Sequence, residues 1–163
     1  MSGRSVLTIG HSNLPLERFL ALLRERSVTL VVDVRSAPYS RHAPQFNREA
    51  LAAALVRAGI EYLYLGRELG GKREPPLSFD RVARLPEFRQ GIEQLAGLAA
   101  ERIVAVVCGE ENPARCHRRS LVTPALVRLG VEVRHVRADG RVQGDDEVAR
   151  EASGGQTLLE FGE

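Results

Sequence analysis

Short apolar runs recur along the chain, and the segments between them carry apolar residues at helical spacing. Strands that are covered on both faces of a parallel sheet read as near-continuous apolar sequence, and these runs have the right length and β-branched content for such strands. They are SVLTIGH, VTLVVDVR, IEYLYLG, RIVAVVC and VEVRHVRA, which begin at residues 5, 28, 60, 102 and 131. The pattern therefore predicts five strands.

Helices are predicted in the intervening segments LPLERFLALLRERS, REALAAALVRAG, PEFRQGIEQLAGLAAE and SLVTPALVRLG. Asn47 is placed to cap the second helix with its side chain, and Gly59 is placed to end it. Pro124 lies inside the last helical segment and is expected to kink or divide it, because proline lacks the N–H that a helix interior uses.

Alternating strands and helices predict an α/β fold, a three-layer sandwich around a mainly parallel, roughly five-stranded sheet of Rossmann-like or flavodoxin-like form. We expect one domain over residues 1–138. Residues 139–163 contain seven acidic and two basic residues, and we interpret them as an acidic C-terminal tail that can be partly ordered. No internal repeat interrupts this arrangement.

The charge is distributed unevenly along the chain. Residues 1–138 contain 21 basic and 14 acidic residues, so the predicted domain carries +7 while the tail carries −5. A positive domain suits anionic ligands without requiring nucleic acid. We therefore expect an anionic small molecule or a nucleotide as the partner, with nucleic acid as an alternative.

The sequence favours a cytoplasmic location and no membrane partner. No apolar run approaches the ~18 residues of a membrane span, and the first residues lack the features of a secretory signal. Cys108 and Cys116 are the only cysteines, which is too few for a disulfide framework. In a reducing compartment such thiols are free, catalytic or metal-bound, although a bridge between them stays open.

Unusual polar and glycine-rich residues follow four of the predicted strands. Since ligands bind outside the carboxyl ends of parallel strands, we expect the site at this edge of the sheet. The candidate catalytic residues are His11, Asp33, Glu110, Cys116 and His117. The candidate ligand-binding residues are Ser12, Arg35, Ser36, Ser40, Gly70, Gly71, Cys108 and Arg118.

The segment CGEENPARCHRR, from Cys108, concentrates thiols, carboxylates and guanidiniums before a helix. If Pro113 begins that helix, Cys116 lies in its opening turns, where the helix dipole and nearby arginines favour a thiolate. The alternative is that both thiols are buried core residues. A metal site with His117 is a further alternative, but the spacing of the two cysteines is not that of common zinc sites. A phosphatase loop is excluded, because six residues instead of five separate Cys108 from Arg115.

His11 is a candidate general base, and Asp33 could orient it or pair with an arginine. The alternative is a structural histidine beside a buried Asp33–Arg35 pair. Forked guanidinium groups suit phosphate or carboxylate, and several arginines could reach the predicted edge. They are Arg35, Arg67, Arg73, Arg118 and Arg119.

The ordered motifs TIGHS, DVRSAPYS, QFN, YLYLGRELGG and CGEENPARCHRR resemble the domain of unknown function 488 family, a group of small, mostly prokaryotic proteins. The resemblance covers residues 6–136 and implies an α/β domain without an established reaction. It adds Pro38, Phe46, Tyr64, Leu69 and Pro113 to the characteristic residues, most of which follow predicted strands.

Three functions are compatible with these residues. The first is an enzyme or ligand-binding protein, such as a transferase or hydrolase, acting on a phosphate-bearing small molecule, nucleotide or nucleic-acid component. The alternatives are a non-catalytic nucleic-acid-binding module and a metal or redox site at the two cysteines. The residues specify neither a cofactor nor an oligomeric state.

Overall fold

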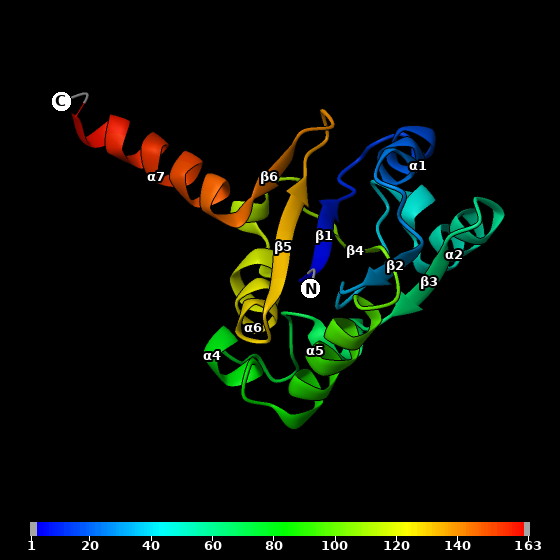
Figure 1. The fold of residues 1–163 in the computed structure, drawn as a ribbon, viewed down its shortest axis with the longest axis horizontal. Helices are drawn as coiled ribbons and strands as arrows, with labels where there is room; N and C mark the ends of the chain where they lie inside the picture. The colour runs from blue at the N-terminus through cyan, green and yellow to red at the C-terminus, as the bar shows by residue number, and fades with distance from the viewer. Residues whose placement is uncertain (1–2, 162–163) are drawn as a thin grey trace.

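Six strands form one sheet in the order β3-β2-β4-β1-β5-β6 (Figure 1). The structure is a computed structural model that describes residues 3–161, with side chains through residue 154. The strands are β1 (Arg4–Gly10), β2 (Leu30–Asp33), β3 (Glu61–Tyr64), β4 (Val104–Cys108), β5 (Val131–Val136) and β6 (Val142–Gly144). The first five are parallel, and β6 pairs with β5 in the antiparallel direction. The mainly parallel α/β sheet is thus confirmed.

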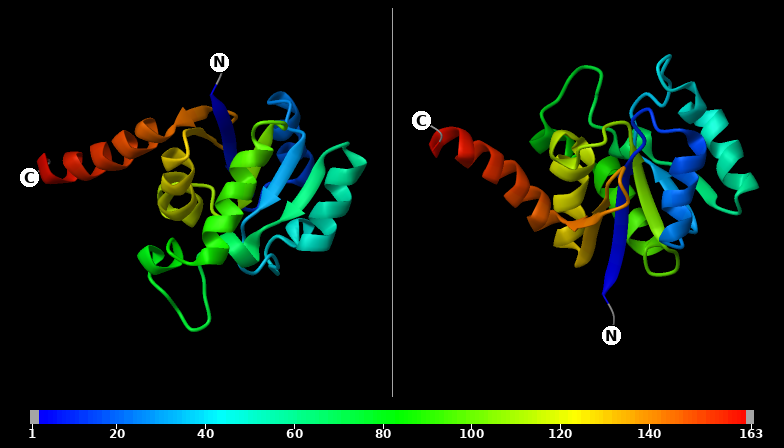
Figure 2. Two further views of the ribbon diagram at one scale, coloured as in Figure 1. Left: turned by 60° about the horizontal axis from the view of Figure 1, so that its bottom comes forward. Right: turned by 90° about the horizontal axis from the view of Figure 1, so that it is seen from above.

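The helices lie on both faces of the sheet and complete the predicted three layers (Figure 2). The helices within residues 3–161 are α1 (Leu16–Glu25), α2 (Arg48–Arg57), α3 (Gly66–Leu69), α4 (Phe79–Val82), α5 (Pro86–Leu98), α6 (Thr123–Arg128) and α7 (Asp145–Phe161). Helices α1 and α2 pack on one face, and α5 and α6 pack on the other. No helix within residues 3–161 has the length and apolar character that crossing a membrane requires.

The central strand β4 shows how the sequence builds these two cores. Alternate residues of a strand point to opposite faces. Val104, Val106 and Cys108 accordingly join the core under α5 and α6, while Ala105 and Val107 join the core under α1 and α2. All five are buried. A strand covered on both faces has no position for an exposed polar residue, which explains its continuous apolar sequence.

The order of the strands differs from the orders of the Rossmann and flavodoxin-like folds that the sequence suggested. Dinucleotide-binding Rossmann sheets run 3-2-1-4-5-6 and flavodoxin-like sheets run 2-1-3-4-5. Here β4 lies between β2 and β1. The Rossmann-like or flavodoxin-like expectation is therefore not confirmed, although the layer architecture is.

The helix ends agree with the predictions made from the sequence, with one exception. Gly59 has a φ of 78° after α2, a conformation that glycine adopts easily, so this prediction is confirmed. Pro124 is confirmed as a divider, since Arg118–Val122 form a π-helical turn and α6 begins at Thr123 with the proline in its first turn. The prediction that the side chain of Asn47 caps α2 is wrong, because it makes no hydrogen bond to the first turn of that helix. Its Oδ1 instead accepts a 2.8 Å hydrogen bond from the backbone N–H of Ser40 and so holds the preceding loop.

The acidic C-terminal residues begin with structured elements. Strand β6 lies beside β5, and α7 projects from it away from the rest of the molecule (Figures 1 and 2). Arg137, directly after β5, bonds to Gln143 of β6 at 2.7 Å and pairs with Glu151 of α7 at 3.4 Å. The first part of the predicted tail therefore extends the sheet, whereas residues 162–163 and the side chains beyond residue 154 lie outside the described part of the chain.

Candidate functional site

The connection that leaves the carboxyl end of β4 crosses to the face of the sheet opposite from the connections of its two neighbours, β1 and β2. The helices that follow β1 and β2 cover one face of the sheet, whereas α6, which follows β4, covers the other. Loops that leave neighbouring strands toward opposite faces open a crevice between them, and ligands bind at such points in open α/β sheets. Cys108 is the last residue of β4 and lies in this crevice.

A cavity of about 680 Å³ opens at this edge and is lined by four separate segments. The segment after β1 contributes His11, Ser12 and Asn13; the one after β2 contributes Arg35, Ser36, Ala37, Tyr39, Ser40, His42 and Ala43; the one after α3 contributes Gly71, Lys72 and Phe79; the one after β4 contributes Cys108, Gly109, Glu110, Arg115, Cys116 and His117. The structure thus brings together ten of the thirteen candidate residues. Asp33, Gly70 and Arg118 lie behind its wall.

Asp33 and Arg35 form a buried ion pair that supports the wall. The guanidinium donates to both carboxylate oxygens at 2.8 Å, from Nε and Nη2. Its Nη1 donates to the carbonyl of Phe46 at 2.7 Å. The phenol of Tyr62 donates to the same carboxylate at 2.6 Å, and burial together with this bond raises the pKa of Tyr62. The geometry therefore supports the structural interpretation of this pair.

His11 is held by two hydrogen bonds and a stacked ring. Nδ1 lies 2.7 Å from the carbonyl oxygen of Ser12, and Nε2 lies 3.1 Å from Nη1 of Arg35. Because a carbonyl only accepts and a guanidinium only donates, the neutral Nδ1–H tautomer satisfies both contacts. Burial lowers the pKa of His11 despite the bond to Ser12, and the charge of Arg35 acts in the same direction. With Phe46 stacked at 4.6 Å, His11 is a neutral, positioned imidazole with neither nitrogen free.

Cys108, Cys116 and His117 meet at the cavity. Nδ1 of His117 lies 3.6 Å from the sulfur of Cys108 and 3.8 Å from that of Cys116. The hydrogen bond from Cys116 lowers the pKa of Cys108 to about 7, aided by the charge of Arg118. The same bond and burial raise the pKa of Cys116 to about 12. The thiol that ionises more readily is therefore Cys108.

The expectation for Cys116 needs correction in its local structure. Pro113 does begin a helical turn, Pro113–Arg115, but this is a single 3₁₀ turn that ends before the cysteine. Cys116 has an extended backbone, with φ −125° and ψ 143°, and the π-helical turn begins beyond it. Cys116 instead lies at the N-terminal end of the next helical segment, because its carbonyl oxygen accepts from the backbone N–H of Ser120 at 3.1 Å and its sulfur accepts from that of Arg118 at 3.4 Å.

Arg118 is fully buried and holds the loop after β4 instead of facing the cavity. Its guanidinium donates to the carbonyl oxygens of Glu110 and Glu111 and, from Nε, to the hydroxyl of Thr8 at 3.0 Å. The loop passes so close to β1 that a Cβ on Gly10 would overlap the Glu110 carbonyl oxygen. Glycine at position 10 is therefore required for this contact.

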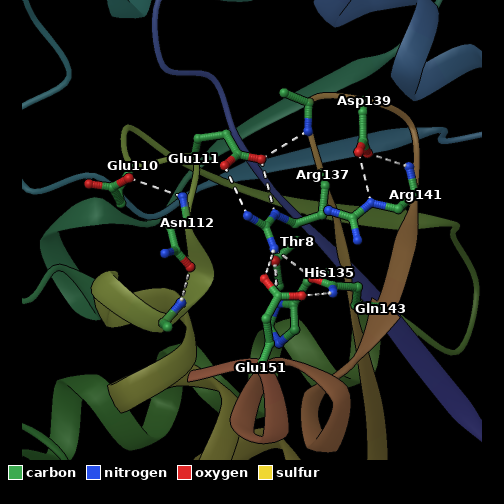
Figure 3. Close-up of polar contacts among 12 residues, drawn as sticks. Thr8, Glu110, Glu111, Asn112, His135, Arg137, Asp139, Arg141, Gln143 and Glu151 are labelled. Atoms are coloured by element: carbon green, nitrogen blue, oxygen red, sulfur yellow. Dashed lines mark hydrogen bonds and ion pairs between the residues drawn. The ribbon is translucent and has the colours of Figure 1, made fainter. Parts of the chain in front are cut away.

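A second anchor holds the same loop from the side of β5 (Figure 3). Arg137 donates to the two carboxylate oxygens of Glu111 at 3.0 and 3.2 Å, and the backbone N–H of Ala138 donates to Glu111 as well. The hydrogen bond from Arg137 lowers the pKa of Glu111. Glu110 points elsewhere: its carboxylate accepts from the backbone N–H of Asn112 at 3.0 Å, and the residue lines the cavity.

The predicted serines and glycines shape the opposite wall. Ser36 Oγ accepts from the backbone N–H of Lys72 at 3.0 Å, and Ser40 Oγ accepts from that of His42 at 3.1 Å. A Cβ on Gly70 would overlap Ser36 Oγ, so this glycine permits close packing of two loops. Ser12 has a φ of 46°, an uncommon value for a non-glycine residue.

Of the five arginines expected at the cavity, Arg35 lines it and the other four do not. Arg73 bonds to the carbonyls of Gly70 and Glu68, and Arg119 pairs with Asp145 at 3.0 Å. Like Arg67 and Arg118, neither lines the cavity. Lys72 and Arg115 do, and they were missed by the sequence reasoning. Lys72 is the sole lysine in a chain of arginines, and Arg115 follows Cys108 at nearly the spacing of a phosphatase loop, so each had a signal in the sequence that did not identify it as a ligand-binding residue.

The chain matches one protein family in comparisons with known proteins. The family model described as Domain of unknown function DUF488 matches residues 15–123, which is more than half of the chain. The match includes the segments after β2, α3 and β4, whereas His11 and Ser12 precede it. No curated protein and no solved structure matches the chain. The chain belongs to the family described as Domain of unknown function DUF488.

Proposed function

We propose that this protein binds and acts on a phosphate-bearing small molecule, nucleotide or nucleic-acid component in the cavity at the carboxyl edge of its sheet. The observation that carries the proposal is the convergence of four loops on one cavity of about 680 Å³. Sites for small molecules are concave, few per protein and about 300–1,000 Å³ in volume. The size of the cavity thus suits a nucleotide better than a long polymer.

The charges at the cavity support an anionic ligand. Lys72 and Arg115 are exposed there, and neither side chain makes a hydrogen bond or ion pair with any side chain described through residue 154. Glu110 is the one acidic residue in the lining. Arg35 also lines the cavity, but Asp33 neutralises it. Two cations without partners favour phosphate, which a guanidinium binds through two parallel hydrogen bonds.

The residues have distinct parts in this proposal. Lys72 and Arg115 bind the anion, while the hydroxyl groups of Ser12, Ser36 and Ser40 line its surroundings. We place the reacting groups at Cys108, Cys116 and His117, with Glu110 at their rim. His11 and the Asp33–Arg35 pair are positioning residues, because their polar atoms are used within the wall.

A matched set of ligands tests the proposal. Nucleoside 5′-monophosphates and the corresponding nucleosides differ only in the phosphate, so their effects on the thermal unfolding midpoint isolate its contribution. We expect stabilisation by one or more monophosphates and little by the nucleosides. Lys72→Gln and Arg115→Gln should each weaken monophosphate binding about tenfold, as expected for the loss of one charged hydrogen bond.

Arg57→Gln is the control, since Arg57 is exposed at the end of α2 that points away from the cavity. It should leave binding unchanged. Equal stabilisation by nucleoside and monophosphate, or equal effects of all three substitutions, contradicts the proposal. Stabilisation by single-stranded oligonucleotides alone, with a steep dependence on salt, favours the nucleic-acid-binding alternative instead.

A further inference from the structure

The three donor atoms at the floor of the cavity are arranged as metal ligands would be. The sulfurs of Cys108 and Cys116 and a ring nitrogen of His117 all lie within 4.8 Å of one another. The two cysteines are separated in sequence, but the fold returns the second to the end of β4 beside the first. The ligand pair with close spacing is Cys116 and His117, which are adjacent in sequence.

The tautomer of His117 leaves Nδ1, the ring nitrogen near the two sulfurs, without a proton and free to bind a metal ion. Nε2 lies 3.0 Å from the backbone carbonyl oxygen of Val34, which can only accept, so the proton is on Nε2. Nδ1, which lies near both sulfurs, therefore carries the free lone pair. Metal-binding histidines almost always donate their other N–H to a carbonyl or carboxylate in this way, and the partner fixes the ring.

The distances fit a tetrahedral ion. Zinc bonds to sulfur at about 2.3 Å and to histidine nitrogen at about 2.0–2.1 Å, so a sulfur and a nitrogen on one tetrahedral ion lie about 3.6 Å apart. The two sulfur–nitrogen distances here are 3.6 and 3.8 Å. Both sulfur–nitrogen distances thus match those of two ligands on one tetrahedral ion, and the two sulfurs lie within 4.8 Å of each other.

The surroundings provide a hydrogen-bond donor to one sulfur and leave one coordination position open. The backbone N–H of Arg118 donates to the sulfur of Cys116 at 3.4 Å, a bond that a metal-bound thiolate accepts more strongly than a thiol. All three ligand residues also line the cavity. Three protein ligands with a fourth position free are typical of catalytic zinc sites, whereas structural sites use four. Thiolate and imidazole ligands exclude the oxygen-preferring ions magnesium and calcium.

We propose that Cys108, Cys116 and His117 bind one zinc ion whose fourth position faces the cavity and takes water or an oxygen of the bound anion. The inference deepens the proposed function, on which it rests for the identity of the ligand, and it names the reacting centre. With two thiolates and a neutral imidazole the zinc site carries no net charge. Lys72 and Arg115 remain the groups that attract the anion.

Metal analysis of the full chain tests the site. The protein, produced without a histidine tag, is stripped by a chelator under reducing conditions and titrated with zinc or cobalt. We expect about one ion per chain. Cobalt should give the visible absorption of tetrahedral coordination and a thiolate-to-cobalt charge-transfer band. Cys116→Ser and His117→Gln should abolish stoichiometric binding, and His42→Gln, which lines the cavity outside the cluster, should retain it.

Wild-type protein supplies a measurement that does not depend on the folding of variants. Zinc should protect both cysteines from alkylation, with an end point at one ion per chain. The inference is overturned if the reduced protein binds no ion at equimolar metal, or if His117→Gln binds as the wild type does. Monophosphate binding, measured on the same samples, separates the two proposals: zinc binding without it overturns only the proposed function, and the reverse result overturns only the zinc site.

Discussion

Arg35 lines the cavity, yet its guanidinium is hydrogen-bonded to other groups of the protein. Four hydrogen bonds connect it to Asp33, His11 and Phe46. Its side chain is 9% exposed, and that of Asp33 is 0% exposed. A pair at this depth is costly to break, because the remaining charge has neither water nor a counter-ion.

Asp33→Asn should therefore lower the free energy of unfolding by about 3–5 kcal/mol, the usual cost of leaving one partner of a buried pair alone. Asp139→Asn is the matched control, since Asp139 and Arg141 form a pair in which both side chains are 57% exposed. We expect that control to change the stability little, because water screens an exposed pair. Urea denaturation measures both, and equal losses would show that the Asp33–Arg35 pair does not support the cavity wall.

Within the elements, the contact between β1 and the loop after β4 determines how close His11 comes to Cys108. The backbone N–H groups of His11 and Ser12 donate to the carbonyls of Cys108 and Gly109 at 2.9 and 2.8 Å. These bonds continue the pairing of β1 and β4 beyond the sheet. Gly10 makes this possible because it has no side chain to meet Glu110.

Gly10→Ala should destabilise the protein by about 1–3 kcal/mol or more, because the new methyl group meets backbone that cannot rotate away. Gly97→Ala provides the comparison. Gly97 lies near the end of α5, where an added methyl group would have nothing within 4 Å, so alanine there should be neutral or stabilising by up to about 1 kcal/mol. Thermal unfolding of both variants tests this, and a neutral Gly10→Ala would contradict the close contact.

At the scale of the whole molecule, a buried polar chain joins the loop after β4 to the start of α7. Arg118 donates to Thr8, the Thr8 hydroxyl lies 2.7 Å from Nδ1 of His135, and Nε2 of His135 lies 2.9 Å from Asp145. Arg119 pairs with the same Asp145. His135 is fully buried, and burial lowers its pKa; Arg118 and Arg119 lower it further, whereas Asp145 raises it.

The lowered pKa of His135 determines how the stability of the protein depends on pH. Since the pKa of His135 in the folded protein lies below its ordinary value of 6.5, the unfolded chain binds the proton first as the pH falls. The stability due to neutral His135 is present above that value and is lost as the pH falls through the folded pKa. Wild type should therefore lose more stability than His135→Asn between about pH 7.5 and about pH 5.5.

Denaturant unfolding at the two pH values measures this difference, with His42→Asn as the exposed counterpart. We expect the wild type and His42→Asn to share the same pH dependence, and His135→Asn to show a weaker one. Parallel curves for all three proteins would mean that the buried imidazole does not titrate in this range.

The sequence predicted the large features of the fold because burial leaves a local pattern. Both faces of β2 and β4 are covered, so their apolar runs were evident, and Gly59 and Pro124 marked helix ends by their own geometry. Strand β6 has only three residues, one of them Gln143, which gives no apolar pattern. The strand order likewise depends on contacts between distant segments.

The site was predictable in location and less so in detail. Topology alone placed the strand-end residues together, and ten of the thirteen candidates line one cavity. The sequence could not show that Arg118 binds carbonyl groups of its own loop while Lys72 and Arg115 face the cavity, because the direction of a side chain depends on tertiary packing. The extended backbone of Cys116 was hidden for the same reason.

The most direct test of the account is a crystal structure of the protein with a nucleoside monophosphate that stabilises it in solution. We expect the phosphate to lie inside the cavity, within hydrogen-bond distance of Lys72 and Arg115 and next to Cys108, Cys116 and His117. A ligand bound at any other surface, with the four loops apart and these side chains separated, would contradict a functional site at the carboxyl edge of the sheet.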